Sequence, residues 1–293
     1  MSKNKKNIFS GVGTALVTPF RNGEIDYAKL DSLIDMQLDA GVDALVIGGT
    51  TGEAATLTEK ERYTLYSYAT ERIGGRAKVV LGTGTNDTSA AIRHTRFAAK
   101  CGADGALAVT PYYNKGTEEG VYRHYMSIAD CSEIPIILYN VPSRTGVNLG
   151  INLLRRLGEH EQIVGIKEAS DSTDRLVELS VLADKLPLYA GNDSQIYVTM
   201  ALGGLGVISV VSNILPGEVK RIATPSLHDP LTALRTQHKL LPLIKVLLAE
   251  TNPSPVKYAM SLMGLCLSDV RLPLSEPRES TKIEIAKAIS DYV

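Results

Sequence analysis

The sequence predicts an α/β protein: a (β/α)8 barrel, or TIM barrel, with a C-terminal helical extension. Two features carry this prediction. Within residues 1–215, eight short apolar runs of strand length alternate with longer stretches whose apolar residues recur at helical spacing. Each intervening stretch is long enough for a helix, so consecutive strands are expected to be parallel. Eight such units most naturally close into a barrel.

The first unit illustrates the pattern. The apolar run Val12–Thr18 has the length of a strand and stops at Pro19. Tyr27–Ala40 then places leucine and isoleucine at intervals typical of an amphipathic helix, and Gly41 ends it. This order of strand and helix repeats through the barrel region.

The second helix carries the clearest start signal. Thr58, followed by Glu61 three residues later, is a capping-box pattern and predicts a helix that runs to about Ile73. The other strands are expected at Asp43–Gly48, Lys78–Gly82, Gly105–Thr110, Pro135–Tyr139, Ile163–Ser170, Leu188–Ala190 and Gly206–Val210. The other helices are expected at Thr88–Cys101, Glu118–Asp130, Asn148–Gly158, Thr173–Leu182 and Ser194–Leu202.

The tail, residues 216–293, shows only helical patterns, punctuated by Pro253 and Pro255. No linker rich in glycine, serine or proline precedes it. We therefore expect residues 1–215 to form the barrel through its eighth strand, and 216–293 to add the last barrel helix and the extension in the same structural unit. A doubly wound open sheet is the alternative. It would need a glycine fingerprint after the first strand, whereas Gly11-Val12-Gly13 precedes that strand.

Composition excludes several classes of function. Lysine plus arginine (31) nearly balances aspartate plus glutamate (32), so no strong field favours nucleic acid or an anionic membrane. The basic start of the chain lacks the apolar core of a signal peptide, and no apolar run is long enough to span a membrane. Three widely spaced cysteines indicate a reducing compartment, the cytoplasm. Five scattered histidines show no metal-ligand spacing, so we expect neither metal nor cofactor.

One lysine stands at the end of an apolar strand. Strand alternation places Lys167 on one face with Gly165 and Ile163, while Val164 and Ile166 face the other way. Gly165 leaves room beside the lysine. Lysine is rarely buried without a partner or a task, and a neutral amine can attack a carbonyl to form a Schiff base. The ordinary alternative is a strand that emerges into solvent at this residue.

Polar residues gather where the expected strands end, which is where barrels place their chemistry. They lie in Gly48–Glu53, Gly82–Asn86, Thr110–Asn114, Tyr139–Gly146, at Lys167 and in Gly191–Asp193. Taken singly, each has a structural explanation, such as a turn glycine or a packing tyrosine. Their convergence on one rim favours a function.

The residue types on this rim suit one kind of chemistry. Lys167 can form an imine with a small keto acid. Hydroxyls of tyrosine and threonine can relay the protons that imine chemistry needs. Arg144 can hold a carboxylate through paired hydrogen bonds, and backbone N–H groups beside Thr50 and Thr51 can hold a second one. The chemistry implied is formation or cleavage of a carbon–carbon bond through an enamine.

Three motifs in this order and spacing resemble the pyruvate-dependent class I lyases related to N-acetylneuraminate lyase. They are Gly-Gly-Thr-Thr-Gly-Glu from Gly48, Tyr-Asn-Val-Pro-Ser-Arg-Thr-Gly from Tyr139, and Gly-Ile-Lys-Glu-Ala from Gly165. The resemblance covers the whole barrel and reaches Asn252-Pro253-Ser254-Pro255-Val256-Lys257 in the tail, where we assign Asn252 no chemistry. It implies condensation of pyruvate with L-aspartate-4-semialdehyde on the diaminopimelate route to L-lysine.

The resemblance also implies roles for single residues. Lys167 matches the Schiff-base lysine and Tyr139 the general acid and base, with Thr50 and Tyr113 as relay partners. Because the relay tyrosine of such enzymes typically comes from a neighbouring subunit, a homotetramer built as a dimer of dimers is implied. The matches to substrate-binding residues are Thr51, Arg144, Gly191 and, through its backbone, Ile208.

Alternative functions remain at this point. Sialate and keto-sugar-acid lyases share the lysine and tyrosine, but they generally lack an arginine at Arg144, because their second substrate is a neutral polyol chain there. A phosphate-binding barrel would need glycine-rich loops after strands seven and eight, and the chain offers one glycine between them. A non-catalytic barrel would not need Lys167 and Tyr139 together.

Feedback inhibition by lysine is a further property of some relatives. Asn86 and Tyr112 match the inhibitor site of sensitive members. Ala90 stands where those members typically carry a glutamate, and Glu59 and Arg62 stand where they often carry histidines. Because the α-amino group of lysine needs that missing carboxylate, we predict weak or absent inhibition.

Overall fold

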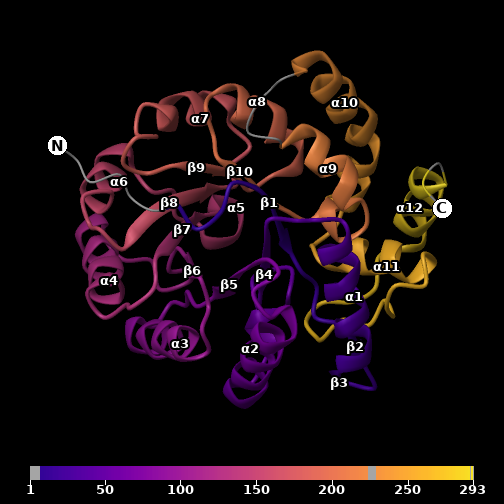
Figure 1. Cartoon of the computed structure of the whole chain (residues 1–293), viewed down its shortest axis with the longest axis horizontal. Coiled ribbons are helices and arrows are strands. Elements are labelled where there is room, and N and C mark those ends of the chain that lie inside the picture. The colour runs from indigo at the N-terminus through magenta and orange to yellow at the C-terminus, as the bar shows by residue number, and fades with distance from the viewer. Residues whose placement is uncertain (1–6, 224–228, 291, 293) are drawn as a thin grey trace.

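A computed structural model describes residues 7–223, 229–290 and 292 of the chain. Eight parallel strands form a closed barrel in the order β1-β10-β9-β8-β7-β6-β5-β4, with β4 paired to β1 (Figure 1). The barrel strands are β1 (Gly11–Ala15), β4 (Ala44–Ile47), β5 (Lys78–Gly82), β6 (Gly105–Val109), β7 (Ile136–Asn140), β8 (Ile163–Glu168), β9 (Leu188–Ala190) and β10 (Gly206–Ser209). The predicted (β/α)8 fold is confirmed.

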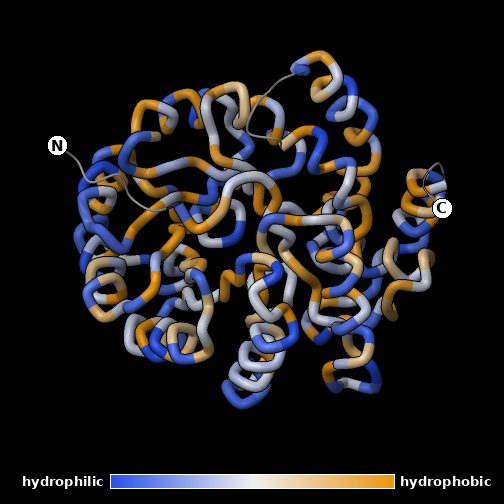
Figure 2. The backbone as a smooth tube through the Cα atoms, in the orientation of Figure 1, coloured by the Kyte–Doolittle hydropathy of each residue, from blue (hydrophilic) through white to orange (hydrophobic). Residues whose placement is uncertain are grey.

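Helices surround the barrel, and the C-terminal helices stand to one side of it (Figure 1). The helices are α1 (Tyr27–Asp39), α2 (Glu59–Ile73), α3 (Thr88–Lys100), α4 (Glu118–Asp130), α5 (Pro142–Thr145), α6 (Ile151–Leu157), α7 (Thr173–Ser180), α8 (Ile196–Ala201), α9 (Pro216–Ile222), α10 (Pro230–Leu247), α11 (Ser254–Leu262) and α12 (Glu279–Ile289). Short 3-10 turns lie at η1 (Ala54–Thr56), η2 (Asp193–Gln195) and η3 (Val211–Asn213). Hydrophobic and hydrophilic residues alternate along the outer helices, as expected where one face packs on the barrel (Figure 2).

The capping box predicted for α2 is present. The Glu61 amide donates to the Thr58 hydroxyl over 3.2 Å, and the Thr58 amide donates to the Glu61 carboxylate over 2.8 Å. These two bonds satisfy amides that the helix itself leaves unpaired, so the helix begins where the sequence indicates.

The apolar core has two layers. The larger layer lies between the strands and the helices, and the smaller one fills the barrel lumen. Lumen residues include Phe9, Val46, Leu107, Ile137 and Ile208. The barrel is therefore a packed core, and a site can open only at its ends.

Strand β8 contains an irregularity that corrects one prediction. Ile136 pairs with Ile163, but Ile137 pairs with Gly165, so the register shifts by one residue. As a result Ile163 packs toward the helices and Val164 into the lumen, opposite to the simple alternation expected from the sequence. The bulge accounts for this difference. From Gly165 onward, the side chains of β8 alternate as the sequence predicts.

The first strand also differs from its prediction. It runs from Gly11 to Ala15 instead of extending to Thr18. Beyond it, the Asn213 side chain accepts from the Val17 amide over 3.1 Å and donates to the Ala15 carbonyl over 2.8 Å. A side chain thus takes the place of a neighbouring strand. The sequence analysis also missed the hairpin of β2 (Phe20–Arg21) with β3 (Glu24–Ile25), and helix α5.

The tail is tied to the barrel at several points. Lys29 on α1 donates to the Gly264 carbonyl over 3.1 Å. Arg271 binds the Glu61 carboxylate on α2 and, through its backbone amide, the Glu53 carboxylate over 2.9 Å. These contacts hold the C-terminal segment against the barrel end at which β4 finishes.

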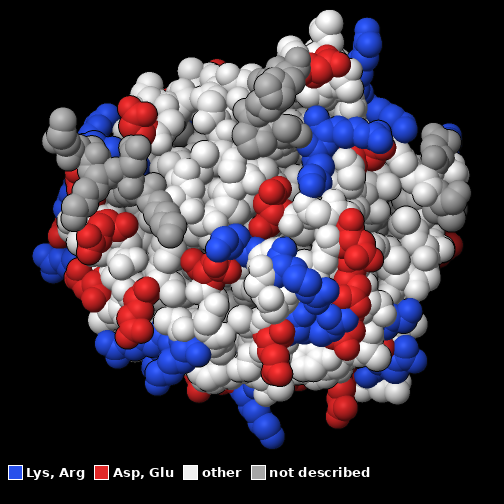
Figure 3. All heavy atoms as spheres, viewed as in Figure 1, with Lys and Arg blue, Asp and Glu red and all other residues white. Residues whose placement is uncertain are grey.

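The surface shown in Figure 3 carries acidic and basic side chains interspersed with one another. Among the described residues, no helix combines the length and apolarity needed to cross a bilayer.

Candidate active site

A cavity of about 480 Å³ opens at the C-terminal ends of β4, β5, β6 and β7. Its walls include Thr50, Tyr112, Tyr139 and Arg144, and the tail contributes Asn252. Four of the residues singled out in the sequence analysis therefore meet in one space, at the end of the barrel where they were expected.

Lys167 lies beside Tyr139 on the neighbouring strand. The two residues are direct register partners between β7 and β8, and the lysine Nζ lies 4.4 Å from the centroid of the tyrosine ring. Both side chains are buried, with 5 % of Lys167 and 7 % of Tyr139 exposed. No hydrogen bond or ion pair found among the described residues engages the Lys167 Nζ, although the Lys167 charge opposes the burial that raises the pKa of Asp193. An amine without a direct ion-pair partner is suited to attack a carbonyl carbon.

The acid next to Lys167 in sequence is not its partner. Glu168 faces the opposite side of β8, where its carboxylate accepts from the Asn140 side chain and from the Ser170 amide over 2.9 Å. Arg175 lies 3.6 Å away on the same side. Strand alternation thus separates a satisfied, buried carboxylate from the lysine.

The end of β7 is held by hydrogen bonds to the Tyr139 carbonyl. The amide and the hydroxyl of Thr110 both donate to it, each over 2.9 Å. Thr110 is itself buried and accepts from the Tyr125 hydroxyl over 3.3 Å. Because the backbone is fixed on both sides, the Tyr139 ring projects from a rigid strand.

Tyr189 lies beside the lysine on the other neighbouring strand, β9. It pairs in register with Lys167, packs at a tilt against Phe9 at 4.7 Å between ring centroids, and donates from its hydroxyl to the Phe9 carbonyl over 2.6 Å. Burial raises the pKa of Tyr189, so this phenol stays neutral. A Cβ on Gly165 would lie 3.1 Å from the Tyr189 ring, so the room that Gly165 leaves is taken by this tyrosine.

The loop after β4 carries Thr50 and Thr51. It begins with Gly48, whose φ of +63° and contact with the Tyr66 ring leave no space for a side chain. Gly82 at the end of β5 packs so closely on Gly48 that a Cβ would meet its carbonyl oxygen at 2.2 Å. The two glycines let the strand ends approach, which brings Thr50 to the cavity wall.

Asn252 is the residue that sequence reasoning missed. Its side-chain amide donates to the Thr51 hydroxyl over 2.9 Å, and its backbone carbonyl accepts from the Arg144 guanidinium over 3.1 Å. It thereby joins two predicted substrate-binding residues. Its position in the Asn-Pro-Ser-Pro-Val-Lys motif was the only signal, because these contacts connect segments that are far apart in the chain.

A buried ion pair lies behind the same loop. Lys257 donates from Nζ to the Glu53 carboxylate over 2.5 Å and to the Asp269 carbonyl over 2.8 Å, and both charged side chains are fully buried. Burial lowers the pKa of Lys257, and the Glu53 charge opposes that change. Nearby, the Arg271 guanidinium lowers the pKa of Glu61 to about 2.

The other predicted residues, Lys167 and Thr51 among them, are not part of the cavity wall. Tyr113 is 89 % exposed and has a φ of +69°, so it projects away from its own barrel. Ile208 is buried in the lumen. Gly191 packs against the end of β8, where its amide donates to the Glu168 carbonyl over 2.6 Å. Asn86 lies at the outer rim, and its carbonyl accepts from Asn114.

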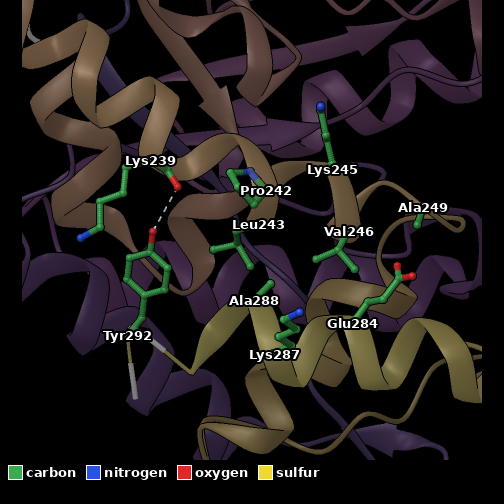
Figure 4. Close-up of a pocket in the computed structure, with 10 residues that line it drawn as sticks. All are labelled: Lys239, Pro242, Leu243, Lys245, Val246, Ala249, Glu284, Lys287, Ala288 and Tyr292. Atoms are coloured by element: carbon green, nitrogen blue, oxygen red, sulfur yellow. Dashed lines mark hydrogen bonds between the residues drawn. The ribbon is translucent and has the colours of Figure 1, made fainter.

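A second cavity of about 460 Å³ lies between α10 and α12 (Figure 4). Lysine side chains and Glu284 surround an apolar base at Leu243 and Val246. None of the predicted site residues lines it. Within the described part of the chain, no cluster of three histidine, cysteine or acidic side chains could hold a metal ion.

Comparisons with known proteins agree with this geometry. Residues 8–292 match the model of the dihydrodipicolinate synthetase family. Curated relatives include the 4-hydroxy-tetrahydrodipicolinate synthases of Fervidobacterium nodosum, 45 % identical over 98 % of this chain and 99 % of that protein, and of Clostridium novyi, 42 % identical over 97 % of both. A solved structure of the Acinetobacter baumannii dihydrodipicolinate synthase, complexed with pyruvate, has a TM-score of 0.94 and 38 % identity, covering 97 % of this chain and 99 % of that one. The chain belongs to the dihydrodipicolinate synthetase family.

Proposed function

We propose that the protein condenses pyruvate with L-aspartate-4-semialdehyde to form 4-hydroxy-tetrahydrodipicolinate, a lyase reaction (EC 4.3.3.7) on the diaminopimelate route to L-lysine. Full-length relatives at 42 % and 45 % identity carry this activity. The observation in the structure that carries the proposal is the buried Lys167 amine, 4.4 Å from the ring of Tyr139 beside a cavity with Arg144 in its wall.

Lys167 supplies the nucleophile. Its amine adds to C2 of pyruvate, and loss of water leaves an imine. Removal of a methyl proton converts the imine into an enamine, whose terminal carbon adds to the aldehyde carbon while the aldehyde oxygen takes up a proton. The α-amine of the second substrate then attacks C2, releases Lys167 and closes the ring.

Tyr139 is the group placed to move these protons. It neighbours Lys167 by strand register and lines the cavity in which the substrates would meet. Thr50 lies in the same wall and is the proposed relay partner. Thr51, Gly191 and the backbone at Ile208 are the proposed contacts for pyruvate. No step calls for a metal or a cofactor, since the amine and the hydroxyls supply every group that the reaction needs.

Arg144 selects the second substrate. Its guanidinium lies at the cavity wall and is oriented by the Asn252 carbonyl. An arginine there suits the carboxylate of an amino-acid aldehyde through paired, charge-assisted hydrogen bonds. In the sialate and sugar-acid lyase alternative, a neutral polyol would lie beside this cation. The Arg144 guanidinium would then have no anionic group of the substrate to bind.

We further propose that the protein forms a homotetramer assembled as a dimer of dimers, and the exposure of Tyr113 supports this proposal. Because it is 89 % exposed and projects from its own barrel, we propose that it completes the relay in a neighbouring subunit. Mixed tetramers of Tyr113→Phe and Lys167→Ala subunits test this. If Tyr113 acts across the interface, mixing restores activity that neither variant has alone. If it acts within its own subunit, mixing restores nothing.

The protein is proposed to work in the cytoplasm. Its three cysteines, Cys101, Cys131 and Cys266, are all free, which suits a reducing compartment.

Reductive trapping tests the proposed function directly. The protein is incubated with pyruvate and borohydride, and its intact mass and peptide map are measured. We expect a stable adduct on Lys167, after which L-aspartate-4-semialdehyde should be consumed in preference to N-acetylmannosamine. A folded protein without an adduct would contradict the lyase assignment. A phosphate-binding barrel or a non-catalytic barrel would then be the favoured function.

A further inference from the structure

The proposed chemistry uses only the Asn252 backbone carbonyl of the Asn-Pro-Ser-Pro-Val-Lys motif, although side chains of the motif also contact the site. Residues 252–257 contact the loop at residues 50–53 twice, through Asn252 on Thr51 and through Lys257 on Glu53. We call these two contacts together the clasp. The two segments lie about 200 residues apart in the chain, so the clasp exists only in the folded protein.

The ion pair of the clasp acts as an anchor. Glu53 and Lys257 are both fully buried, so removing either one leaves the other as a buried charge without an ion-pair partner. Glu53 also adopts a left-handed backbone conformation, with a φ of +54°. A residue other than glycine rarely adopts this conformation unless its contacts hold it there. The contacts of the Glu53 carboxylate with Lys257 and with the Arg271 amide hold it here.

The other contact orients a hydroxyl. Thr51 is 3 % exposed, and its oxygen accepts from the Asn252 amide over 2.9 Å. A threonine hydroxyl has one proton to donate. No hydrogen bond found among the described residues uses that proton, so it is left for another acceptor. A carboxylate, which only accepts hydrogen bonds, is the complementary ligand.

The Asn252 amide has a second unusual property. Its Oδ1 atom is buried and has no hydrogen-bond partner, although the residue is only 7 % exposed. Buried polar atoms are nearly always paired, so an orphan acceptor calls for an explanation. In the structure the amide nitrogen of Asn252, and not Oδ1, faces the Thr51 hydroxyl, so Asn252 does not use the Thr51 proton.

We infer that Asn252 is a positioning residue for pyruvate: by donating to Thr51, it aims the threonine proton at the carboxylate of the keto acid. This inference rests on the proposed function, because it assumes that pyruvate binds beside Lys167. The tail therefore sets the affinity of the first substrate. Arg144 depends only on the backbone carbonyl of residue 252, which every substitution of the side chain retains.

Trapping with borohydride over a range of pyruvate concentrations measures the half-saturation without the aldehyde. For Asn252→Ala we expect this half-saturation to rise about tenfold, the effect of losing one oriented hydrogen bond to a charged group. The KM for L-aspartate-4-semialdehyde should change much less. Asn152→Ala, on the exposed face of α6, is the matched control and should match the wild type.

A double variant identifies the route of the effect. Thr51→Val removes the hydroxyl that Asn252 is inferred to aim. Adding Asn252→Ala to Thr51→Val should then weaken pyruvate capture little further, because the two residues act as one unit. Fully additive losses would mean that Asn252 acts by another route and would overturn the inference.

Asn252→Asp keeps the shape of the side chain and inverts its hydrogen bonding. The carboxylate must take the Thr51 proton, and it also repels pyruvate, so half-saturation should rise above that of Asn252→Ala. Protonation of the aspartate restores a donor. The ratio of variant to wild type should therefore fall as the pH is lowered from about 8 to about 5.5. A ratio that does not change with pH would contradict the inferred orientation.

The outcomes separate this inference from the proposed function. Wild-type protein that fails to trap pyruvate refutes both. Wild-type protein that traps pyruvate, with folded Asn252→Ala and Asn252→Asp variants of unchanged half-saturation, refutes only the role of Asn252. Circular dichroism and the melting temperature establish that each variant is folded.

Discussion

The proposed reacting groups and the proposed recognition groups of this protein are built in different ways. Lys167 and Tyr139 stand on adjacent barrel strands, in direct register and packed from both sides. Arg144 stands on the four-residue helix α5, and Thr51 on a loop. Both are oriented by Asn252, from a segment beyond the barrel.

If the proposed roles hold, this difference assigns chemistry and selectivity to separate parts of the fold. Strand positions are fixed by a continuous ladder of backbone hydrogen bonds, which suits an amine and a phenol that must hold one geometry. Loops and tail segments can change without disturbing that ladder. A substitution of Lys167 or Tyr139 in the strands should therefore abolish or strongly slow turnover. A substitution in the loop that carries Thr51 or in α5 with Arg144, which we call the mouth, should change which substrate binds and how tightly.

Lys167→Ala should have the largest effect. Without the amine no imine can form, so borohydride should trap no pyruvate and turnover should be lost. The melting temperature is the accompanying measurement, because removal of a buried lysine with no ion-pair partner should not unfold the barrel. Residual trapping on another lysine would show that the nucleophile has been assigned wrongly.

Tyr139→Phe should slow turnover by roughly 10²–10⁴-fold, the usual scale for a positioned acid or base. The ring and its packing remain, so the fold and initial pyruvate binding should persist. Steady-state kinetics, with trapping as the control for binding, measure the effect. Normal turnover in this variant would remove Tyr139 from the relay.

Most of the barrel could be predicted because its signals are local. The capping box at Thr58 and the apolar run Lys78–Gly82 specify their elements within a few residues. The register shift at Ile163 and Val164 could not be predicted, since it depends on how β8 pairs with β7. The early end of β1 likewise depends on Asn213, a residue distant in the chain.

The site divides in the same way. Thr50, Tyr139 and Arg144 were predicted as a group because barrel strand ends converge, and the structure brings them to one cavity. Asn252 escaped prediction because its partners are set by tertiary packing and not by any local pattern. The roles assigned to these residues remain predictions, and the substitutions described here test them.

Lys257→Met tests whether the mouth depends on the tail. It would leave Glu53 as an unpaired, buried charge, so we expect a loss of about 3–5 kcal/mol in the free energy of unfolding, measured by denaturant titration. Lys60→Met, at an exposed position on α2, should change stability little and serves as the control. The double variant Glu53→Gln/Lys257→Met should recover part of the loss. A single variant as stable as wild type would contradict an anchoring role.

Arg144→Ala should affect the two substrates unequally. Loss of a charge-assisted contact should raise the KM for L-aspartate-4-semialdehyde by about 10- to 100-fold. Half-saturation for pyruvate, measured by trapping, should stay near the wild-type value, because Arg144 contacts the tail and the cavity wall and not the lysine. Equal losses for both substrates would contradict the assignment of recognition to the mouth.

The smallest effect is expected from added lysine. Arg62 donates to the Ala54 carbonyl over 2.6 Å and to the Gly82 carbonyl over 3.3 Å, so a cation already occupies this edge of the cavity. Ala90 provides no carboxylate for an α-amino group. A second cation brought beside Arg62 would meet repulsion, and Asn86 and Tyr112 offer no compensating charge. A lysine titration of the initial rate should therefore show weak or no inhibition. Strong inhibition at micromolar to low-millimolar lysine would mean that the mouth recognises an effector by contacts other than a carboxylate at residue 90.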